Sequence, residues 1–403
     1  MEKNLERGDL ADQLFENYGG YRENLIKASL IHHDDIKNIL SDLGKSALFK
    51  VEEIGRSVEG REIFSITFGT GKTDILAWSQ MHGDEPTATA ALFDLLKFFS
   101  ACDSFDPLRK ELLSKLKFHF IPMLNPDGAR LFQRENAFNI DINRDALRLE
   151  SNESKLLWNY SEKADPEFCF NLHDQNSYYT SGRSGKHSTI SILAPPSDHL
   201  KSINYAREKS MQVILKIEEA LKKFIPGGIA RYSDDHEPRS FGDNFIKNGR
   251  SSILIESGYF KSDPDKEFVR KLNFISLITA FVSIAGRDFE KINYTEYFNI
   301  PENQEMLFDL LLRNLILKMN GSEFKIDIGI NRKKKYDPAT KKFFYSSTIQ
   351  EVGDLSFHSG IEEYNFENHI IISSGKIAAD EPADLVLTGR EKVVIKNGFI
   401  IKD

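Results

Sequence analysis

Cysteine, positive charge and long apolar runs are all scarce in this chain. Only two cysteines occur among 403 residues, so the chain suits a reducing compartment. Acidic residues outnumber basic ones by 61 to 53, and the net charge of −8 disfavours a duplex nucleic-acid partner, because counterion release needs a basic surface. No run approaches the roughly 20 apolar residues of a membrane span, and no signal-peptide core follows the charged start, residues 1–7. We therefore expect a cytoplasmic protein with no nucleic-acid or membrane partner.

The chain does have the material for a large core. Its hydrophobic content of 40% and aromatic content of 11% indicate a globular protein, and its length fits one large domain plus a small one. Cys169 falls in an expected buried strand, which favours an inert packing role. The one basic run, residues 332–335, lies between strand-like stretches and is interpreted as a solvated hairpin loop.

Four short apolar runs each end at polar residues of the kinds that occur in active sites. Runs of this length and composition are typical of buried strands, and in open α/β sheets function collects at the carboxyl ends of the strands. Residues 74–81 run into His82-Gly83-Asp84-Glu85, residues 118–124 into Asn125-Pro126-Asp127-Gly128, residues 168–172 into His173, and residues 252–255 into Glu256. We therefore predict that two histidines and two glutamates lie along one edge of one sheet.

The spacing of apolar residues outside these four runs predicts further strands and helices of an α/β architecture. Strand-like alternation covers residues 48–70, and a helix is expected after Pro86. Apolar residues recur near helical spacing over 8–46, 201–224 and 263–286. The predicted fold is a mixed, largely doubly wound sheet flanked by helices, in a first domain over residues 1–299 that includes a helical segment over 1–46.

The character of the sequence changes near Ile300-Pro301. Helical spacing persists over residues 304–319, and Asn320-Gly321 then turns the chain. Short alternating runs follow, with Asn397-Gly398 as a hairpin signal; they cover residues 324–329, 343–349, 369–374, 385–388, 393–396 and 399–402. We expect a small C-terminal β domain over residues 300–403.

His82, Glu85 and His173 form a candidate metal site. Catalytic zinc sites usually combine three His and carboxylate ligands with one open position for water. Taken singly, an H-x-x-E pair is more often a surface contact, and a strand histidine more often bonds a carbonyl. Together, at matching strand ends, they favour a divalent metal, and nitrogen and oxygen ligands suit zinc.

The chain also offers a base and several guanidinium groups. Glu256 ends a buried strand, where burial raises the pKa of a carboxyl towards the working pH; the alternative is a carboxylate paired with a lysine or arginine. Residues 130–144 supply Arg130, Arg134 and Arg144, which could bind a carboxylate or an oxyanion. Each arginine alone is more often part of a surface ion pair.

These motifs, taken in order, resemble the zinc metallocarboxypeptidase family typified by carboxypeptidase A. The resemblance covers roughly residues 50–290 and rests on H-G-D-E, N-P-D-G, R-x-N-x-x-x-x-D-I-N-R, H-D-Q, L-I-E-S-G and the upstream G-R-S-V-E-G-R. Asn139 stands where this family often has glycine, and asparagine tolerates the left-handed conformation that glycine would adopt. Ile142 replaces the family's common leucine, which is a near-isosteric change.

The resemblance implies a role for each matching residue. His82, Glu85 and His173 would bind one zinc ion, and Glu256 would be the general base. The other implied roles are Arg134 for the scissile carbonyl, Asn143 and Arg144 for the substrate carboxylate, and Tyr232 as the nearest match to a mobile tyrosine.

The sequence therefore predicts a zinc-dependent hydrolase of a peptide or amide bond beside a free carboxylate, most simply a carboxypeptidase. One alternative is an N-acyl amino-acid deacylase of the aspartoacylase or succinylglutamate desuccinylase type, and another is a murein-peptide amidase. A non-catalytic binding protein of the same fold is a further alternative, although such a protein is expected to lose the base or a ligand. The expected partner is a peptide or N-acyl amino acid, and the oligomeric state is not predicted.

Overall fold

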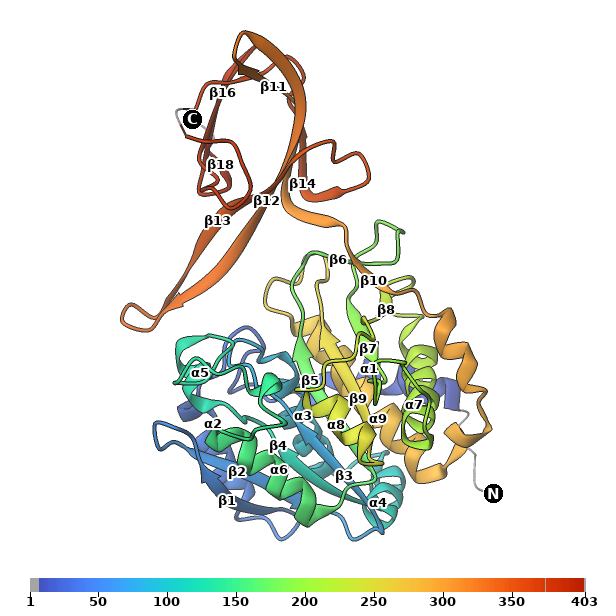
Figure 1. Ribbon diagram of the computed structural model, residues 1–403. Coiled ribbons are helices and arrows are strands. Elements are labelled where there is room, and N and C mark those ends of the chain that lie inside the picture. Colours follow the sequence, from blue (N-terminus) through green and yellow to red (C-terminus); the bar gives the residue numbers. More distant parts are fainter. Residues whose placement is uncertain (1–6, 374, 402–403) are drawn as a thin grey trace. The chain divides into compact units, whose positions relative to one another are not determined.

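The chain divides into two structural units, each with its own sheet. A computed structural model describes residues 7–373 and 375–401 (Figure 1), so most of the charged start lies outside the described residues. Unit 1 comprises Met1–Gln175 and Ser188–Asn303, and unit 2 comprises Asn176–His187 and Gln304–Asp403. The sequence placed all residues before 300 in the first domain, and the contribution of residues 176–187 to unit 2 was not anticipated.

Unit 1 is built on a mixed eight-stranded sheet in the order β1-β2-β4-β3-β5-β9-β7-β8. The four central strands β4, β3, β5 and β9 are parallel, β1 and β2 form an antiparallel pair at one edge, and β7 is antiparallel to β9. The strands are β1 (Lys50–Arg56), β2 (Glu62–Phe68), β3 (Thr73–Trp78), β4 (Leu116–Ile121), β5 (Phe168–Asp174), β7 (Ile190–Leu193), β8 (Ile229–Arg231) and β9 (Ser251–Ser257). The four predicted apolar runs are confirmed as β3, β4, β5 and β9.

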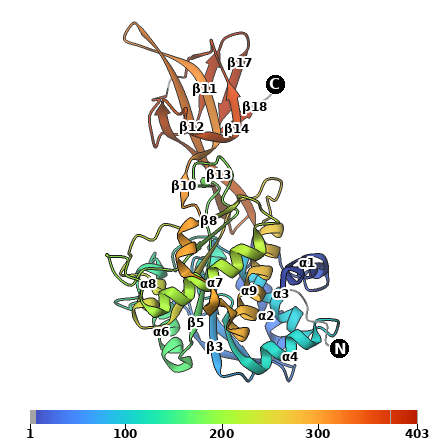
Figure 2. The same cartoon turned by 90° about the vertical axis from the view of Figure 1, so that its right-hand side faces the viewer.

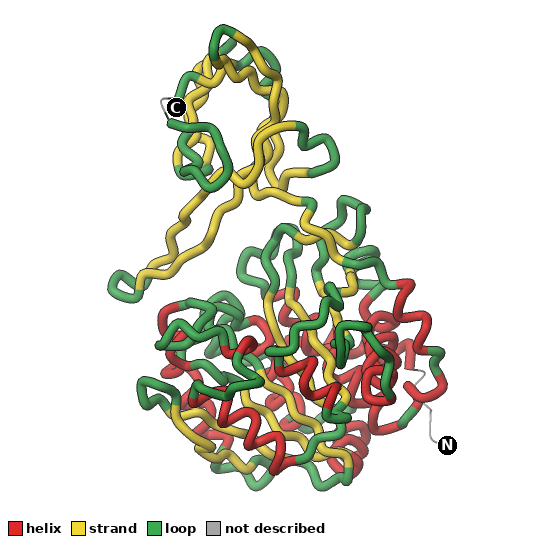
Figure 3. The backbone as a smooth tube through the Cα atoms, viewed as in Figure 1, coloured by secondary structure: helices red, strands yellow, loops and turns green. Residues whose placement is uncertain are grey.

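Helices cover both faces of this sheet (Figures 2 and 3). In β3, Ile75 and Ala77 face one hydrophobic cluster, while Leu76 and Trp78 face a second cluster on the other side. This alternation is expected when both faces of a strand are covered. The helices are α1 (Arg7–Asn17), α2 (His33–Leu43), α3 (Thr87–Ser100), α4 (Asp106–Lys115), α5 (Pro126–Leu131), α6 (Asn152–Ala164), α7 (Tyr205–Leu221), α8 (Phe241–Lys247) and α9 (Glu267–Gly286), with 3-10 turns at Tyr18–Gly20, Ile142–Arg144, Asp288–Lys291 and Tyr294–Asn299. The predicted mixed α/β fold flanked by helices is confirmed.

The predicted helical segment over residues 8–46 is interrupted between α1 and α2. Residues 21–32 follow an irregular path because side chains from elsewhere bind their backbone. Arg270 donates to the carbonyls of Glu23 (2.8 Å) and Ile26 (3.2 Å), and Asp94 accepts from the Glu23 N–H (2.7 Å). These tertiary bonds replace the hydrogen bonds of a helix.

Helix α9 has the length and apolar character of a membrane span, which the sequence analysis did not anticipate. It is the only helix in the described ranges that meets this test, and 72% of its apolar window is buried inside the protein. It contacts α3 and α7, and residues such as Leu277 and Phe281 are fully buried in the core. These contacts are those of a central core helix.

Unit 2 contains a second eight-stranded sheet with a small core of its own. The strand order is β13-β12-β11-β15-β16-β17-β18, with β14 paired to β11, and β6 and β10 form a separate pair. The strands are β6 (Tyr179–Ser181), β10 (Asn303–Glu305), β11 (Leu307–Met319), β12 (Ser322–Asp337), β13 (Lys342–Gly353), β14 (Ser359–Asn365), β15 (Ile370–Ile371), β16 (Leu385–Thr388), β17 (Lys392–Lys396) and β18 (Phe399–Ile401). The expected short β runs are present. Of the run over residues 369–374, only β15 is a strand. Residue 374 of that run and Lys402 of the last run lie outside the described part.

The helix predicted over residues 304–319 is wrong, because this segment is mainly strand β11. The strand is buried on both sides: Leu310, Leu312 and Leu315 lie in the main core of unit 2, and Leu311 lies in a second small cluster. A bulge between Leu312 and Leu315, with Asn314 at a φ of 60°, shifts the side-chain register. Two-sided burial and the bulge together produce apolar spacing that imitates a helix.

The basic run over residues 332–335 also differs from its prediction. It lies within β12, paired in register with β13 from Asn331↔Thr348 to Asp337↔Lys342. β12 and β13 extend as a two-stranded ribbon past the last residue that pairs with β11, Ile330 (Figure 1). The positive charges are therefore held on a regular strand and not in a solvated loop.

Candidate metal centre

The ends of parallel strands bring the candidate residues of unit 1 together. His173 in β5 is the register partner of Glu256 in β9, and His82 and Glu85 lie in the loop that follows β3. All four residues are buried, with exposed fractions of 8% or less. This edge of the sheet is the one at which the sequence placed them.

The loop that carries His82 and Glu85 is held against the next loop of the sheet. Gln80 adopts a left-handed φ of 44°, and its carbonyl accepts from Asn125 N–H at 2.9 Å. Gly83 is in such close contact with Gly128 that a Cβ atom would lie 2.0 Å from the Gly128 carbonyl carbon. Glycine at position 83 is thus required by a close approach of two backbones.

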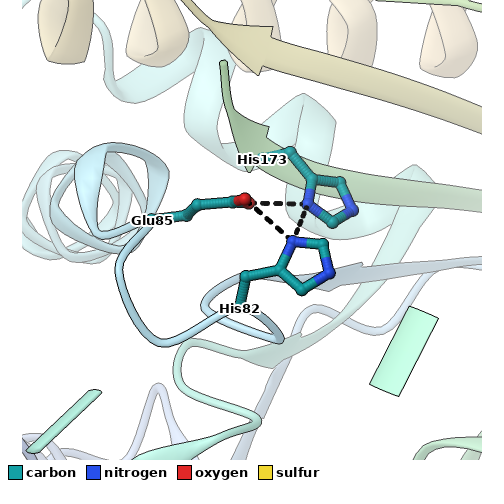
Figure 4. A group of neighbouring side chains, drawn as sticks. All are labelled: His82, Glu85 and His173. Carbon is teal, nitrogen blue, oxygen red and sulfur yellow. Dashed lines mark hydrogen bonds and ion pairs between the residues drawn. The ribbon is translucent and has the colours of Figure 1, made fainter. Parts of the chain in front are cut away.

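His82, Glu85 and His173 converge on one point (Figure 4). The Nδ1 atoms of the two histidines are 3.1 Å apart, and Glu85 contacts His82 Nδ1 at 2.8 Å and His173 Nδ1 at 2.7 Å. Candidate ligand atoms from all three residues lie within 4.8 Å of one another. This distance allows all three to bind a single ion.

The charges within the cluster are strongly coupled. Burial opposes ionisation of Glu85, but His82 and His173 hold its pKa well below the ordinary value. Burial alone would lower the pKa of His82, yet the charge of Glu85 and the bond to Asp141 raise it to about 9. Burial lowers the pKa of His173, which favours the neutral imidazole that binds metals.

Asp141 orients His82 from the other side of the ring. Its carboxylate lies 3.1 Å from His82 Nε2, and it can only accept while ionised. His82 and Arg134 hold the pKa of Asp141 well below its usual range, against the effect of burial. In neutral His82, Nε2 therefore carries the proton and the lone pair is on Nδ1, which faces Glu85 and His173. Asp141 was part of the quoted motif, but the sequence analysis gave it no role.

Arg134 lies beside the cluster. Its guanidinium donates to Asp141 at 3.0 Å, and Nη1 lies 3.0 Å from His82 Nδ1 and 3.4 Å from Glu85. The side chain is 39% exposed, so it is anchored at one end and accessible at the other. The Arg134 guanidinium is therefore in a suitable position to bind a negatively charged group next to the cluster.

Glu256 is a buried carboxyl group at this edge with a strongly raised pKa. Burial, and next the negative charge of Glu85, raise its pKa to about 8. Among the described residues, no hydrogen bond or ion pair ties its carboxyl group to another side chain, in contrast to the carboxylates of Glu85 and Asp141. A buried carboxyl with such a pKa can exchange a proton near neutral pH.

Asn143 and Arg144 lie in the 3-10 turn that Asp141 caps. The Asn143 Oδ1 accepts from Phe241 N–H at 3.1 Å, which leaves its amide N–H groups to donate elsewhere. Arg144 pairs with Glu237 at 3.1 Å, and Glu237 also binds Arg239 at 2.7 Å. The pairing of Arg144 with Glu237 was not foreseen from the sequence.

Tyr232 lies immediately after β8, and its N–H donates to Ile192 at 2.9 Å. This bond continues the pairing of β8 with β7 by one residue. The role implied for Tyr232 by the resemblance stays a prediction.

Two of the quoted motifs contact each other behind the site. Asp127 of N-P-D-G accepts from Ser57 Oγ at 2.8 Å and from Glu59 N–H at 2.9 Å, and it also pairs with Arg61. Asn139 has a φ of 57°, as expected for a residue in place of glycine. These residues shape the loops and do not enter the metal cluster.

Asp174 is a second buried residue that sequence reasoning did not single out. Its backbone N–H donates to Glu85 at 3.2 Å, and its carboxylate accepts from Thr87 (2.6 Å) and Lys266 (3.2 Å). Lys266 also donates to the Ser257 carbonyl at 2.9 Å. This network ties the ends of β5 and β9 together. The only sign of this network in the sequence was that an acidic residue, Asp174, directly follows His173.

The cluster suits a divalent metal by the chemistry of its donors. Two histidines and one glutamate are a known ligand set of catalytic zinc. The 3.1 Å separation of the two Nδ1 atoms directs two ring nitrogens at one buried carboxylate, an arrangement that a cation between them would satisfy. Asp141 contacts His82 in the way that carboxylates commonly contact ligating histidines in zinc sites.

Comparisons with known proteins agree with this description. The family model for zinc carboxypeptidases matches residues 36–201. Carboxypeptidase SOL1 of Arabidopsis thaliana is 32% identical over 123 residues, covering 28% of this chain and 25% of that protein. Carboxypeptidase 2 of Trichophyton equinum is 27% identical over 260 residues, covering 59% of this chain and 44% of that protein. The matches thus span less than half the length of these relatives.

Solved structures show the same fold. A metallo-carboxypeptidase from Burkholderia cenocepacia superposes with a TM-score of 0.53 at 18% identity, over 64% of this chain and 70% of that chain. Carboxypeptidase A from Helicoverpa armigera gives 0.52 at 15% identity, over 70% and 80%. The fold is that of the metallocarboxypeptidases. The family model and the relatives thus make part of this chain similar to zinc carboxypeptidases.

Proposed function

We propose that this chain is a metallocarboxypeptidase that binds one zinc ion and hydrolyses a peptide or amide bond beside a free carboxylate. The observation that carries the proposal is the convergence of His82, Glu85 and His173, with Glu256 next to His173 in the sheet register. These four side chains would supply a ligand set and a base at the same strand ends. A binding protein without catalysis would have no need of the base.

His82, Glu85 and His173 would hold the zinc ion. When bound, zinc acts as a Lewis acid that lowers the pKa of water and polarises a carbonyl. The residues of the chain then perform the remaining tasks of binding, orientation and proton transfer.

Glu256 would act as general base and then as general acid. Its raised pKa of about 8 lets the carboxylate take a proton from the attacking water and return it to the leaving amine. Arg134, held by Asp141, would donate to the oxyanion that develops on the scissile carbonyl. The mobile tyrosine would be Tyr232.

Asn143 and Arg144 would bind the substrate's terminal carboxylate. The Asn143 side chain is oriented by Phe241 so that its N–H groups are available, and Arg144 supplies a guanidinium for a charge-assisted bond. Fixing the carboxylate would place the adjacent carbonyl beside Arg134 and the metal ligands. The substrate class is therefore a peptide or an N-acyl amino acid with a free C-terminus.

The proposal is tested with the zinc-loaded protein and an N-blocked dipeptide, compared with the same dipeptide amidated at its C-terminus. We expect turnover of the free acid only, and loss of turnover on chelation. In Glu256→Gln, kcat should fall by about a hundredfold or more with zinc content unchanged. Appreciable hydrolysis by this variant would refute the role of Glu256. Preference for acetyl or succinyl amino acids over the dipeptide would instead favour a deacylase.

A further inference from the structure

The outer part of the β12–β13 ribbon carries a concentration of positive charge that the rest of the chain lacks. Residues 332–347 contain six basic residues and one acidic residue, a net charge of +5. Because the whole chain carries −8, the remainder carries −13. The one acid, Asp337, is already used within the turn, where it accepts from Ala339 N–H (3.0 Å) and Thr340 Oγ1 (2.6 Å).

One face of the ribbon, here called the lysine face, carries Lys333, Lys335, Lys342 and Phe344, together with the turn residue Asp337 opposite Lys342. Phe344 is the direct partner of Lys335, while Lys333 and Lys342 belong to the pairs two positions away on either side, and these even offsets keep all four on one face. Phe344 is 48% exposed, and the three lysines are exposed as well. Within the described residues, none of these three lysines forms an ion pair.

The opposite face of the ribbon is occupied by internal contacts. The Lys334 Nζ lies 3.9 Å from the centroid of Phe343, and Arg332 lies 4.2 Å from that of Phe399 and donates to the Gly398 carbonyl at 2.9 Å. Some other exposed lysines of unit 2 are ion-paired, such as Lys318 with Glu323. The lysine face therefore brings together three exposed cations, none of which is ion-paired within the described residues.

We propose that the lysine face binds an acidic polypeptide segment in extended conformation. Lys333 and Lys335 are two residues apart on a strand, so their side chains are separated by about 7 Å, which is also the spacing of alternate side chains in an extended peptide. Carboxylates at alternate positions would thus match successive lysines, with Phe344 contacting the apolar stems between them. This inference does not depend on peptidase activity.

Other polyanions fit the ribbon less well. Single-stranded nucleic acids are usually held by aromatic rings on which successive bases stack, and the lysine face offers one exposed ring, Phe344. A membrane-inserting tip needs apolar anchors, whereas the turn reads Asp337-Pro338-Ala339-Thr340-Lys341. A charge of −13 on the rest of the chain opposes contact with a broad anionic surface, but a short acidic segment can bind the ribbon alone.

The direct test is fluorescence anisotropy with the full chain and a labelled peptide of about eight residues that alternates Glu and Ser, a length that matches the outer ribbon. Its C-terminus is amidated, so that the proposed catalytic site is not being measured. We expect saturable binding that weakens as salt shortens the Debye length from about 10 Å at 0.1 M to about 3 Å at 1 M. The matched peptide that alternates Gln and Ser should bind at least about tenfold more weakly.

Variants locate the binding surface. The triple variant K333S/K335S/K342S should bind the Glu–Ser peptide about tenfold more weakly, whereas K318S/K325S, which removes two ion-paired lysines of the same unit, should bind it as the parent does. Circular dichroism checks that both variants are folded. Unchanged affinity in the triple variant, or equal binding of the Gln–Ser peptide, would overturn the proposal. Tighter binding of single-stranded RNA or of phosphatidylserine vesicles would assign the surface to a different partner and overturn it as well.

Discussion

At the residue scale, the site depends on side chains that are oriented by other side chains. His82 is held by Asp141 at 3.1 Å, Arg134 by the same carboxylate at 3.0 Å, and Asn143 by Phe241 at 3.1 Å. Each bond leaves another polar group of the same side chain available: Nδ1 of His82, the far end of the Arg134 guanidinium and the Asn143 amide N–H groups. A site that is oriented in this way needs little rearrangement when substrate binds.

The pair of Arg144 and Glu237 leads to a prediction about substrate affinity. Glu237 occupies the guanidinium that we assign to the substrate carboxylate, so it competes with substrate. Arg144→Ala should raise KM for free-acid substrates about tenfold, and Glu237→Gln should lower KM by a few-fold with kcat unchanged. Steady-state kinetics on a free-acid and an amidated dipeptide measure both effects. An Arg144→Ala variant with the parent's KM would show that the carboxylate binds elsewhere.

At the scale of elements, a buried ion pair positions the N-terminal segment against the core. Arg270 of α9 donates to Asp94 of α3 at 2.7 Å, and neither side chain is exposed to solvent. Asp94 also accepts from Tyr18 at 2.7 Å. One ion pair thereby links α3, α9 and the irregular segment over residues 21–32.

Removing one partner of this pair should destabilise unit 1. Arg270→Met leaves the Asp94 carboxylate buried without a cation, and such losses amount to about 3–5 kcal/mol. Arg270→Lys, which keeps the charge, should lose less. Urea unfolding measures the change, and limited proteolysis between residues 21 and 32 reports on the segment. A loss below about 1 kcal/mol in Arg270→Met would contradict this account.

At the scale of the whole molecule, the two units have separate hydrophobic cores. Chains of this kind often unfold in more than one step. The proposed zinc ligands all belong to unit 1, so metal binding should stabilise that unit alone. Lysine-rich β12 belongs to unit 2, and substitutions there should leave the zinc effect unchanged.

Calorimetry of the metal-free and zinc-loaded protein tests this prediction. At a zinc concentration about 100 times the Kd, binding contributes about 2.7 kcal/mol, which corresponds to a rise of about 5–10 °C in the Tm of one transition. The other transition should not move. In the matched variant His173→Ala, zinc should shift neither transition, and a shift of the same size in that variant would place the metal outside the proposed cluster.

The sequence was sufficient for the strands that carry the site. Apolar runs over residues 74–81 and 168–172 mark strands β3 and β5 without reference to the rest of the chain, and the edge rule for parallel sheets then brings His82 and His173 together. The same reasoning was wrong for β11, because two-sided burial and a bulge at Asn314 produced helical spacing. The local pattern of apolar residues predicts a strand reliably where the alternation of buried side chains is not interrupted by a bulge.

By itself, therefore, the sequence determined which residues end the central strands of unit 1, since hydrophobic periodicity and strand termini are local properties. Only the tertiary structure decided that Asp141 orients His82, that Glu237 pairs with Arg144, and that residues 332–335 form a charged ribbon and not a loop. Each of these depends on contacts between segments that are distant in the chain or on the register of a strand pair. Such contacts follow from packing, which no local pattern of residues records.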